Sequence, residues 1–246
     1  MKVITSLVSS VAAAVVCTGL PATSAFVPSP NTMKKQSPSS SLPSTTSPTL
    51  VEEVALQSTF AIAPDDLILR AKEILGPTIG VGTLDHGACL APNFEFCAPV
   101  VGPLPKDEYL GALESFQLTD SFDITQNFFG FVVDPLQTNR VYFFSRQEAT
   151  HTASFMGAEP TGKVLSLPPQ CHHLDFDEEG LVTEFGFYTV DRRQGNTGGL
   201  GGAFGYFYGV GRPLPIPECQ PYTPSFRFRM LNWIGRLGKI MQKLKE

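Results

Sequence analysis

The spacing of apolar residues changes along the chain, and this change limits the folds that the chain can adopt. From Leu67 to Ile74, and again from Tyr109 to Phe116, apolar residues recur at the spacing of one helix face. From residue 121 to residue 190, apolar and polar residues alternate instead, which is the pattern of half-buried strands. Two helices followed by consecutive strands predict an α+β domain, with the helices packed on one face of a curved antiparallel sheet.

Turn-forming residues predict the limits of these elements. Pro64, followed by two acids, favours a helix start, and Gly76-Pro77 favours its end. A second helix is expected to open at Leu104, after a short strand at 94–97. Long strands are expected at 121–133, 140–156, 163–177 and 181–190, the third interrupted by a bulge or edge at Pro168-Pro169.

Composition narrows the class of protein further. The chain has 246 residues, of which 19 are Phe, so a large aromatic core is expected. Its net charge of −5 argues against a nucleic-acid partner. The four cysteines that follow Cys17 form no Cys-x-x-Cys pair and no even spacing, so we interpret them as free thiols in a reducing compartment.

The first 50 residues read as targeting sequence rather than as part of the fold. Residues 1–25 have the basic start, short apolar run and small residues of a signal peptide, although an uncleaved anchor stays an alternative. Residues 26–50 are rich in Ser, Thr and Pro and carry no acid, as transit peptides do. The string Ala22–Pro28 resembles the bipartite presequences of algae with diatom-type complex plastids. This resemblance implies a plastid location, and simple secretion is the alternative.

Four short strings carry a resemblance to a known family. They occur on the expected elements and in this order: Phe94-Glu95-Phe96 with Gly102–Leu110, Arg146 with Thr150-His151-Thr152, Pro160–Lys163, and Phe176–Val182. Together they are similar to the SnoaL-like domains, over residues 65–191. The resemblance implies a cone-shaped α+β barrel at 59–191, with one pocket between sheet and helices. Family enzymes carry out acid–base chemistry on apolar substrates in that pocket.

His172 is the first candidate for a catalytic residue. Alternation along 170–176 places it on one face with Leu174 and Phe176, and places His173 on the other face with Asp175. The resemblance implies that His172 occupies the position where the cyclases carry a catalytic Asp. The alternative is a core histidine that is bonded to a backbone carbonyl.

Further candidates follow on the neighbouring strands. Arg146 and His151 are expected on opposite faces of one strand, so that only one of them lines the pocket. Arg146 could orient a carboxylate or carbonyl group, or pair with Glu148 at the surface. Tyr188 and Asp191 are further hydrogen-bonding groups near the end of the last strand.

A Gly/Pro-rich extension at 192–224 lies outside the family core. Arg192 and Arg193 precede flexible glycines and could form an anion-binding nest. The alternative is a loop that passes tightly over the open end of the cone. The stretch matches neither a P-loop nor a dinucleotide fingerprint, and the histidines lack metal-ligand spacing, so no cofactor and no metal are expected.

The tail at 225–246 predicts a basic amphipathic helix. Apolar residues recur at 4-3-4-3 spacing, and six cations surround them against the single acid Glu246. This pattern is typical of binding to an anionic membrane surface or an acidic partner. Docking on the acidic domain of the same chain is the alternative. The apolar residues are Met230, Ile234, Leu237, Met241 and Leu244.

These observations leave three functions open. The first is a plastid SnoaL-like protein that binds a small apolar ligand and acts as an isomerase, cyclase or dehydratase. The second is a non-catalytic binding or scaffold protein at a thylakoid or envelope membrane, and a homodimer stays open for either. The third is an iota-class carbonic anhydrase, which shares the fold. It is the least favoured, because Leu174-Asp175 follow His172-His173 where that class carries Ser-Ser.

Overall fold

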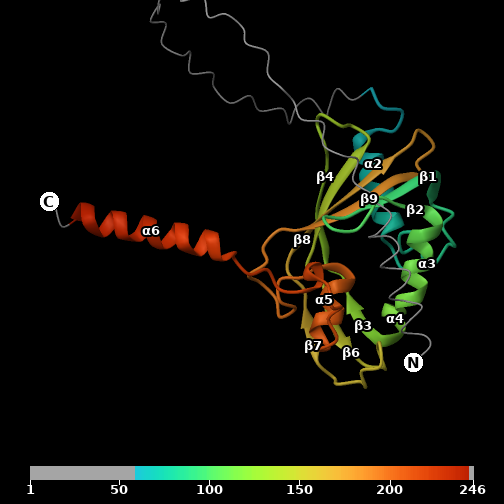
Figure 1. The fold of residues 1–246 in the computed structure, drawn as a ribbon. Helices are drawn as coiled ribbons and strands as arrows, with labels where there is room; N and C mark the ends of the chain where they lie inside the picture. The colour runs from blue at the N-terminus through green and yellow to red at the C-terminus, as the bar shows by residue number, and fades with distance from the viewer. Residues whose placement is uncertain (1–58, 244–246) are drawn as a thin grey trace, which may run out of the picture. The chain divides into compact units, whose positions relative to one another are not determined.

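The computed structural model describes residues 59–243, so the expected signal and transit peptides lie outside the described residues. A helix, a short stretch of strand and a second helix precede the run of consecutive strands, as the sequence predicts, and further helices follow the last strand (Figure 1). In chain order the elements are α2 (Pro64–Ile74), β1 (Leu90–Cys97), β2 (Leu104–Pro105), α3 (Lys106–Phe116), α4 (Leu118–Ser121), β3 (Phe122–Thr125), β4 (Phe128–Val133), β5 (Arg140–Ser145), β6 (Glu148–His151), β7 (Val164–Ser166), β8 (Gln170–Phe176), β9 (Val182–Thr189), α5 (Gly202–Gly209), a 3-10 turn (Pro217–Cys219) and α6 (Phe226–Lys243).

The strands form two sheets, and the predicted α+β class is confirmed. One sheet has six strands in the order β2-β1-β9-β8-β5-β4, and the other has three in the order β3-β6-β7. Both are antiparallel apart from the β1–β9 pair, which is parallel. The parallel pair departs from the expected meander. It joins segments about 90 residues apart, and a contact of that kind leaves no local signal in a sequence.

Three of the expected long strands are each two strands. Each one breaks near its middle, and its halves pair in different sheets. Asn127 has a left-handed φ of 49° between β3 and β4, and Pro168-Pro169 separate β7 from β8 because proline cannot donate to a ladder. β5 and β6 separate at residues 146–147. The breaks let one chain path turn from the large sheet into the small one, which gives the cone its curvature.

Other element limits also differ from expectation. The first strand begins at Leu90 rather than at residue 94. Leu104-Pro105 form the short strand β2, so α3 begins at Lys106. Pro64 stands in the first turn of α2, as expected, but the helix ends at Ile74 before Gly76.

The two helices bury the faces that the sequence predicts. Leu67, Ala71 and Ile74 of α2 are completely buried in the cluster that covers the large sheet. On α3, Tyr109 is buried, and its ring lies 5.2 Å from Phe94 and 5.3 Å from Phe96, centroid to centroid. Burying such rings contributes about 1.5–3 kcal/mol per side chain, which makes this aromatic layer a main source of stability.

The extension after residue 191 supplies part of the core. Tyr206 and Phe207 of α5 are buried against Phe122 and Phe155 in a second cluster over the small sheet. Gly202 begins α5 with a φ of +53°, and a Cβ there would lie 2.4 Å from the Phe187 ring. The chain therefore needs glycine at this contact, where the extension meets β9.

Candidate functional site

His172 lies inside the fold, on the face shared with Leu174 and Phe176. Only 8% of its surface is exposed. β8 pairs with β5 and β9 so that His172 stands opposite Phe143 and Phe187. The imidazole stacks parallel to the Phe143 ring at a centroid distance of 5.0 Å. The ring of Phe185 is also parallel to it, at 6.1 Å. The expected register is thus observed, and aromatic side chains surround the imidazole.

Each ring nitrogen of His172 is in a different environment. Nε2 lies 2.9 Å from the hydroxyl of Ser145, in a hydrogen bond whose direction depends on the imidazole tautomer. Nδ1 is buried and has no hydrogen-bond partner among residues 59–243. Burial, and secondarily the nearby His173, lower the His172 pKa from 6.5 to about 3. The imidazole is therefore neutral at neutral pH, where it can donate or accept a hydrogen bond.

Ser145 and Gln170 join His172, and the sequence reasoning missed both. Each is almost fully buried, and each lies on the inward face of its strand. The Gln170 amide nitrogen has no hydrogen-bond partner within the described part of the chain. A Cβ on Gly201 would lie 3.0 Å from it, so the segment leading into α5 covers Gln170. The same alternation that placed His172 would have placed Gln170 beside it.

We call these three residues the buried polar cluster. An unsatisfied buried donor or acceptor costs about 1–3 kcal/mol, and the cluster contains two such atoms, His172 Nδ1 and Gln170 Nε2. The rings of four phenylalanines also lie between 5.0 and 6.1 Å from the His172 ring, centroid to centroid. Such an arrangement suits hydrogen bonds to one carbonyl or hydroxyl group of an otherwise apolar molecule.

Arg146 does not belong to this cluster. It lies in the break between β5 and β6, it is exposed, and its guanidinium donates to the side-chain oxygen of Gln194 at 2.6 Å. With Asn127 and Ser166 it lines a surface hollow of about 160 Å³ at the strand breaks. The expectation that Arg146 and His151 occupy opposite faces of one strand is wrong, because the strand ends at Ser145.

His151 is fully buried in a separate place. It ends β6, and its ring stacks on Phe122 at 5.0 Å. Nδ1 is hydrogen-bonded to the Thr161 hydroxyl at 3.1 Å, and Nε2 has no partner in the described chain. Phe122 also contacts Tyr206 of α5. His151 thus belongs to the cluster over the small sheet rather than to the one around His172.

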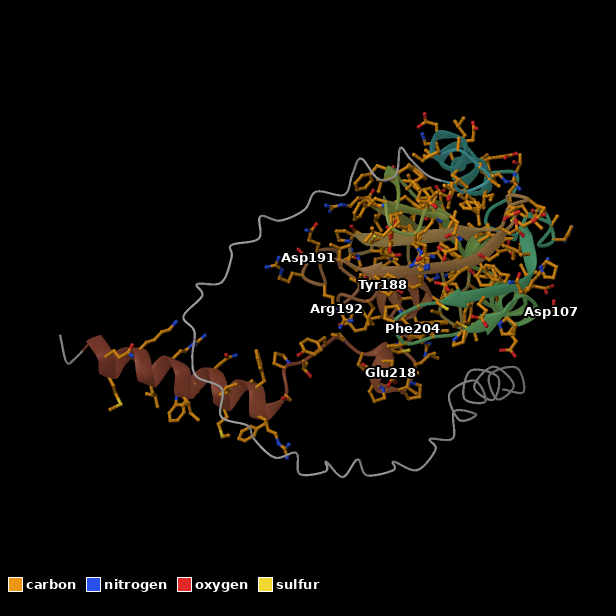
Figure 2. All side chains as sticks on the ribbon, turned by 90° about the horizontal axis from the view of Figure 1, so that it is seen from above. Asp107, Tyr188, Asp191, Arg192, Phe204 and Glu218 are labelled. Atoms are coloured by element: carbon orange, nitrogen blue, oxygen red, sulfur yellow. The ribbon has the colours of Figure 1, made fainter. Side chains whose placement is uncertain are left out.

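Tyr188 is exposed and Asp191 is half-buried, and neither belongs to the core; both are labelled in Figure 2. Tyr188 is 46% exposed and stacks on His173 at 6.0 Å, on the outer face of the sheet. Asp191 accepts hydrogen bonds from the side chains of Arg193 and Gln194, which hold its pKa well below the usual range. Neither residue is near the His172 ring nitrogens by strand register, so the structure does not assemble them with the buried polar cluster.

The Gly-rich segment that follows Arg193 packs as a tight loop against the sheet, and the structure does not favour an anion-binding nest there. A Cβ on Gly195 would lie 2.3 Å from the carbonyl oxygen of Ser166, so this backbone packs directly against β7. Arg193 is engaged by Asp191, and the guanidinium of Arg192 lies over the Tyr222 ring at 5.9 Å. Both cations already have partners within the chain.

The outer face of the large sheet holds a second polar group of residues. Arg140 binds Asp175 through two hydrogen bonds of 2.5 and 2.7 Å, and it also contacts Glu184 at 3.2 Å. Nε2 of His173 donates to Glu184 at 2.7 Å. Asp175 accepts a further bond from Gln137. These side chains pair with one another, although the buried Nδ1 of His173 has no hydrogen-bond partner among residues 59–243. The network links β5, β8 and β9 and so supports the fold.

The remaining reactive side chains add no site. The four described cysteines are free, as the sequence predicts, and burial raises the pKa of Cys89 to about 12. Its thiol is therefore not a nucleophile at neutral pH. Within residues 59–243, no three His, Cys, Asp or Glu side chains lie close enough together to hold a metal ion.

Among known proteins, this chain is similar to several whose structures have been solved. No family model matches the chain, and no curated protein matches it significantly. AclR of Streptomyces galilaeus, to which a hydroxylase activity is attributed, is 20% identical over 50% of this chain and 86% of its own, with a TM-score of 0.39. IdmH of Streptomyces antibioticus, to which a polyketide cyclase activity is attributed, is 21% identical over 52% and 93%, with a TM-score of 0.40. A Jannaschia protein assigned to the SnoaL-like polyketide cyclases is 16% identical over 51% and 86%, with a TM-score of 0.38. We draw no functional conclusion from likeness at this level.

Proposed function

We propose that this protein binds one small, largely apolar molecule inside its cone, through a carbonyl or hydroxyl group of that molecule. The observation that carries the proposal is the pair of buried, unpartnered atoms His172 Nδ1 and Gln170 Nε2 on one inward strand face. A ligand oxygen would accept from Gln170 and complete the hydrogen bonding of His172. Phe143 and Phe185 would contact the apolar part of the ligand, and Ser145 would fix the His172 ring.

Acid–base catalysis at His172 is the second candidate function. It is supported by the Ser145–His172 hydrogen bond, which orients the imidazole, and by the resemblance of residues 65–191 to SnoaL-like domains. The low pKa of His172 favours binding over catalysis, because an imidazole with a pKa of about 3 is a weak base at neutral pH. An isomerase, cyclase or dehydratase reaction would need a substrate that raises this pKa.

The location and assembly of the protein are proposals as well. A plastid location is supported by the acid-free Ser/Pro-rich segment and by the Ala22–Pro28 string, both from sequence alone. A homodimer remains compatible with these observations. An iota-class carbonic anhydrase activity has the weakest support. Leu174 and Asp175 stand where that class carries two serines, and Leu174 is part of the apolar core.

Native mass spectrometry of the protein purified from its own cells tests the binding proposal. We expect the wild-type protein to carry a noncovalent small molecule and His172→Phe to have lost most of it. The phenylalanine fits among the surrounding rings but offers no hydrogen bond. Gln170→Leu should have the same effect. His86→Asn, at an exposed histidine, is the matched control and should retain the molecule.

Two outcomes would overturn the proposal. One is a wild-type protein whose mass is that of the polypeptide alone. The other is equal retention of the molecule by wild type and by both cluster variants, while circular dichroism shows all of them to be folded.

A further inference from the structure

Helix α6 exposes both of its faces. Ser225 caps its start, with the side-chain oxygen accepting from the backbone N–H of Phe228 at 3.3 Å. From Phe226 to Gln242 every residue is exposed. Trp233 is 61% exposed, and eight other large apolar residues of α6 are between 38% and 77% exposed. Large apolar side chains gathered on one element at such exposure mark a binding surface.

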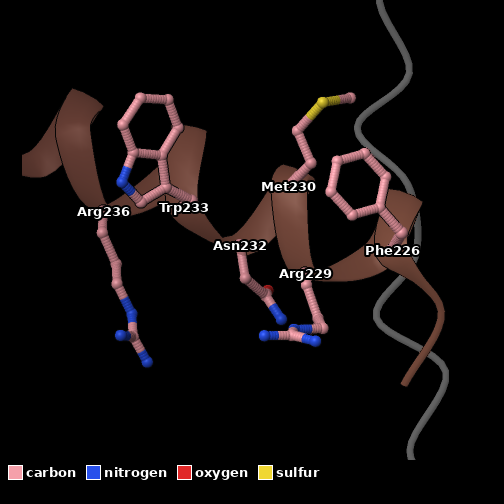
Figure 3. Close-up of a pocket in the computed structure, with 6 residues that line it drawn as sticks. All are labelled: Phe226, Arg229, Met230, Asn232, Trp233 and Arg236. Carbon is pink, nitrogen blue, oxygen red and sulfur yellow. The ribbon is translucent and has the colours of Figure 1, made fainter. Parts of the chain in front are cut away.

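Most of the large apolar side chains of α6 lie on one side of the helix, and only Phe228 and Leu231 lie outside that side. Figure 3 shows Phe226, Met230 and Trp233 on one side of the helix and Arg229, Asn232 and Arg236 on the other. At 100° per residue, Ile234, Leu237, Ile240 and Met241 extend the apolar side into one sector about 120° wide. Over 18 residues this sector runs for about 27 Å.

Charge argues against a second copy of α6 as the occupant of this face. The helix carries five cations and no acid: Arg227, Arg229, Arg236, Lys239 and Lys243. In a helix pair, Arg229 and Arg236 would border the seam, and the partner helix would offer no carboxylate to them. Two such helices would repel each other.

Two further features separate α6 from a packed or membrane-spanning helix. A Cβ on Gly235 or Gly238 would meet nothing within 4 Å, so no other element packs against the helix at these glycines. Each weakens an isolated helix, which then gains from an external surface. In the described part of the chain, no helix is long and apolar enough to cross a membrane.

We propose that α6 binds the surface of a membrane rich in anionic lipid and lies parallel to it. The apolar sector would enter the boundary between headgroups and acyl chains, with Trp233 at headgroup depth. Arg229 and Arg236, which border that sector, would contact lipid phosphates. The apolar sector matches the acyl-chain region of such a surface, and the bordering cations, with no acid beside them, match its anionic headgroups. This proposal is independent of the ligand proposed for the cone.

Vesicle flotation with the purified chain tests this proposal. We expect the protein to float with vesicles that contain phosphatidylglycerol and not with phosphatidylcholine vesicles. Binding should weaken at about 0.5 M salt, because salt screens the attraction between lipid and cations. The double variant Arg229→Glu/Arg236→Glu should bind at least about tenfold more weakly. Arg212→Glu, a charge reversal at an exposed site outside α6, is the matched control and should bind as wild type does.

The other occupants predict different results. If α6 docks on its own domain, removing residues 223–246 lowers the melting temperature and no vesicle binds the intact chain. If it pairs with a second copy, sedimentation shows a dimer that this truncation abolishes, again without vesicle binding. If it binds an acidic peptide, a polyglutamate chain binds it and anionic vesicles do not. Each of these results would overturn the membrane proposal.

Discussion

Replacing Arg140 with methionine should lower the free energy of unfolding by about 3 kcal/mol. The guanidinium is 18% exposed and Asp175 is 9% exposed, so the substitution leaves a nearly buried carboxylate with only Gln137 as a side-chain partner. Glu184 loses the same cation. Removing one partner of a buried ion pair costs about 3–5 kcal/mol. We place this effect at the lower end of that range, because water reaches part of the network. Urea denaturation followed by circular dichroism measures it.

Arg193→Met is the matched control for this prediction. Arg193 makes the same kind of bidentate contact, with Asp191, but its side chain is 89% exposed. An exposed pair contributes about 1 kcal/mol or less, so this variant should unfold close to wild type. Equal effects of the two substitutions would show that the Arg140 network does not stabilise the sheet.

Acid should destabilise the wild-type protein more than His172→Phe. The pKa of His172 is about 3 in the folded protein and near 6.5 in the unfolded chain. Between these values the unfolded chain binds more protons, so stability falls as the pH decreases through this window. From pH 7 to pH 5 this group alone should cost the wild type about 2 kcal/mol. His172→Phe should lack that part of the loss.

Urea denaturation at the two pH values provides the comparison, because the difference between the two proteins isolates the contribution of the His172 imidazole. His86→Asn removes an exposed histidine, and its loss of stability should equal that of the wild type. Identical losses for wild type and His172→Phe would mean that the imidazole is not buried in its neutral form.

Residue alternation was sufficient to predict which side of β8 faces the core. That rule places His172 with Leu174 and Phe176, which belong to the apolar cluster over the large sheet. The other face of β8 is buried as well, at His173 and Asp175, but its side chains join the polar network with Arg140 and Glu184. Helical spacing of apolar residues predicts the buried faces of α2 and α3 in the same way. Alternation holds within one short strand whatever its distant neighbours are, which is why these predictions succeed.

The strand breaks and the partners of His172 could not be predicted in this way. Apolar and polar residues keep alternating through 121–133 and 140–156, although each segment divides between two sheets. The chain turns at Asn127 and at residues 146–147, and these turns leave the spacing of apolar residues almost unchanged. Ser145 meets His172 only through the pairing of β5 with β8. Gln170 is covered by Gly201, from a segment about 30 residues later. Contacts between residues so far apart in the sequence depend on how the strands pair, and the spacing of apolar residues does not predict that pairing.

The ring nitrogens of His172 provide the most direct test of the proposed binding site. Their ¹⁵N chemical shifts report both protonation and hydrogen bonding, and His172→Phe assigns the signals. The measurement compares bacterially produced protein before and after addition of an apolar extract of the protein's own cells. We predict that the Nδ1 signal of His172 shifts, while the signals of His86 and His173 stay unchanged. An unchanged His172 spectrum in the presence of that extract would contradict a ligand at the buried polar cluster.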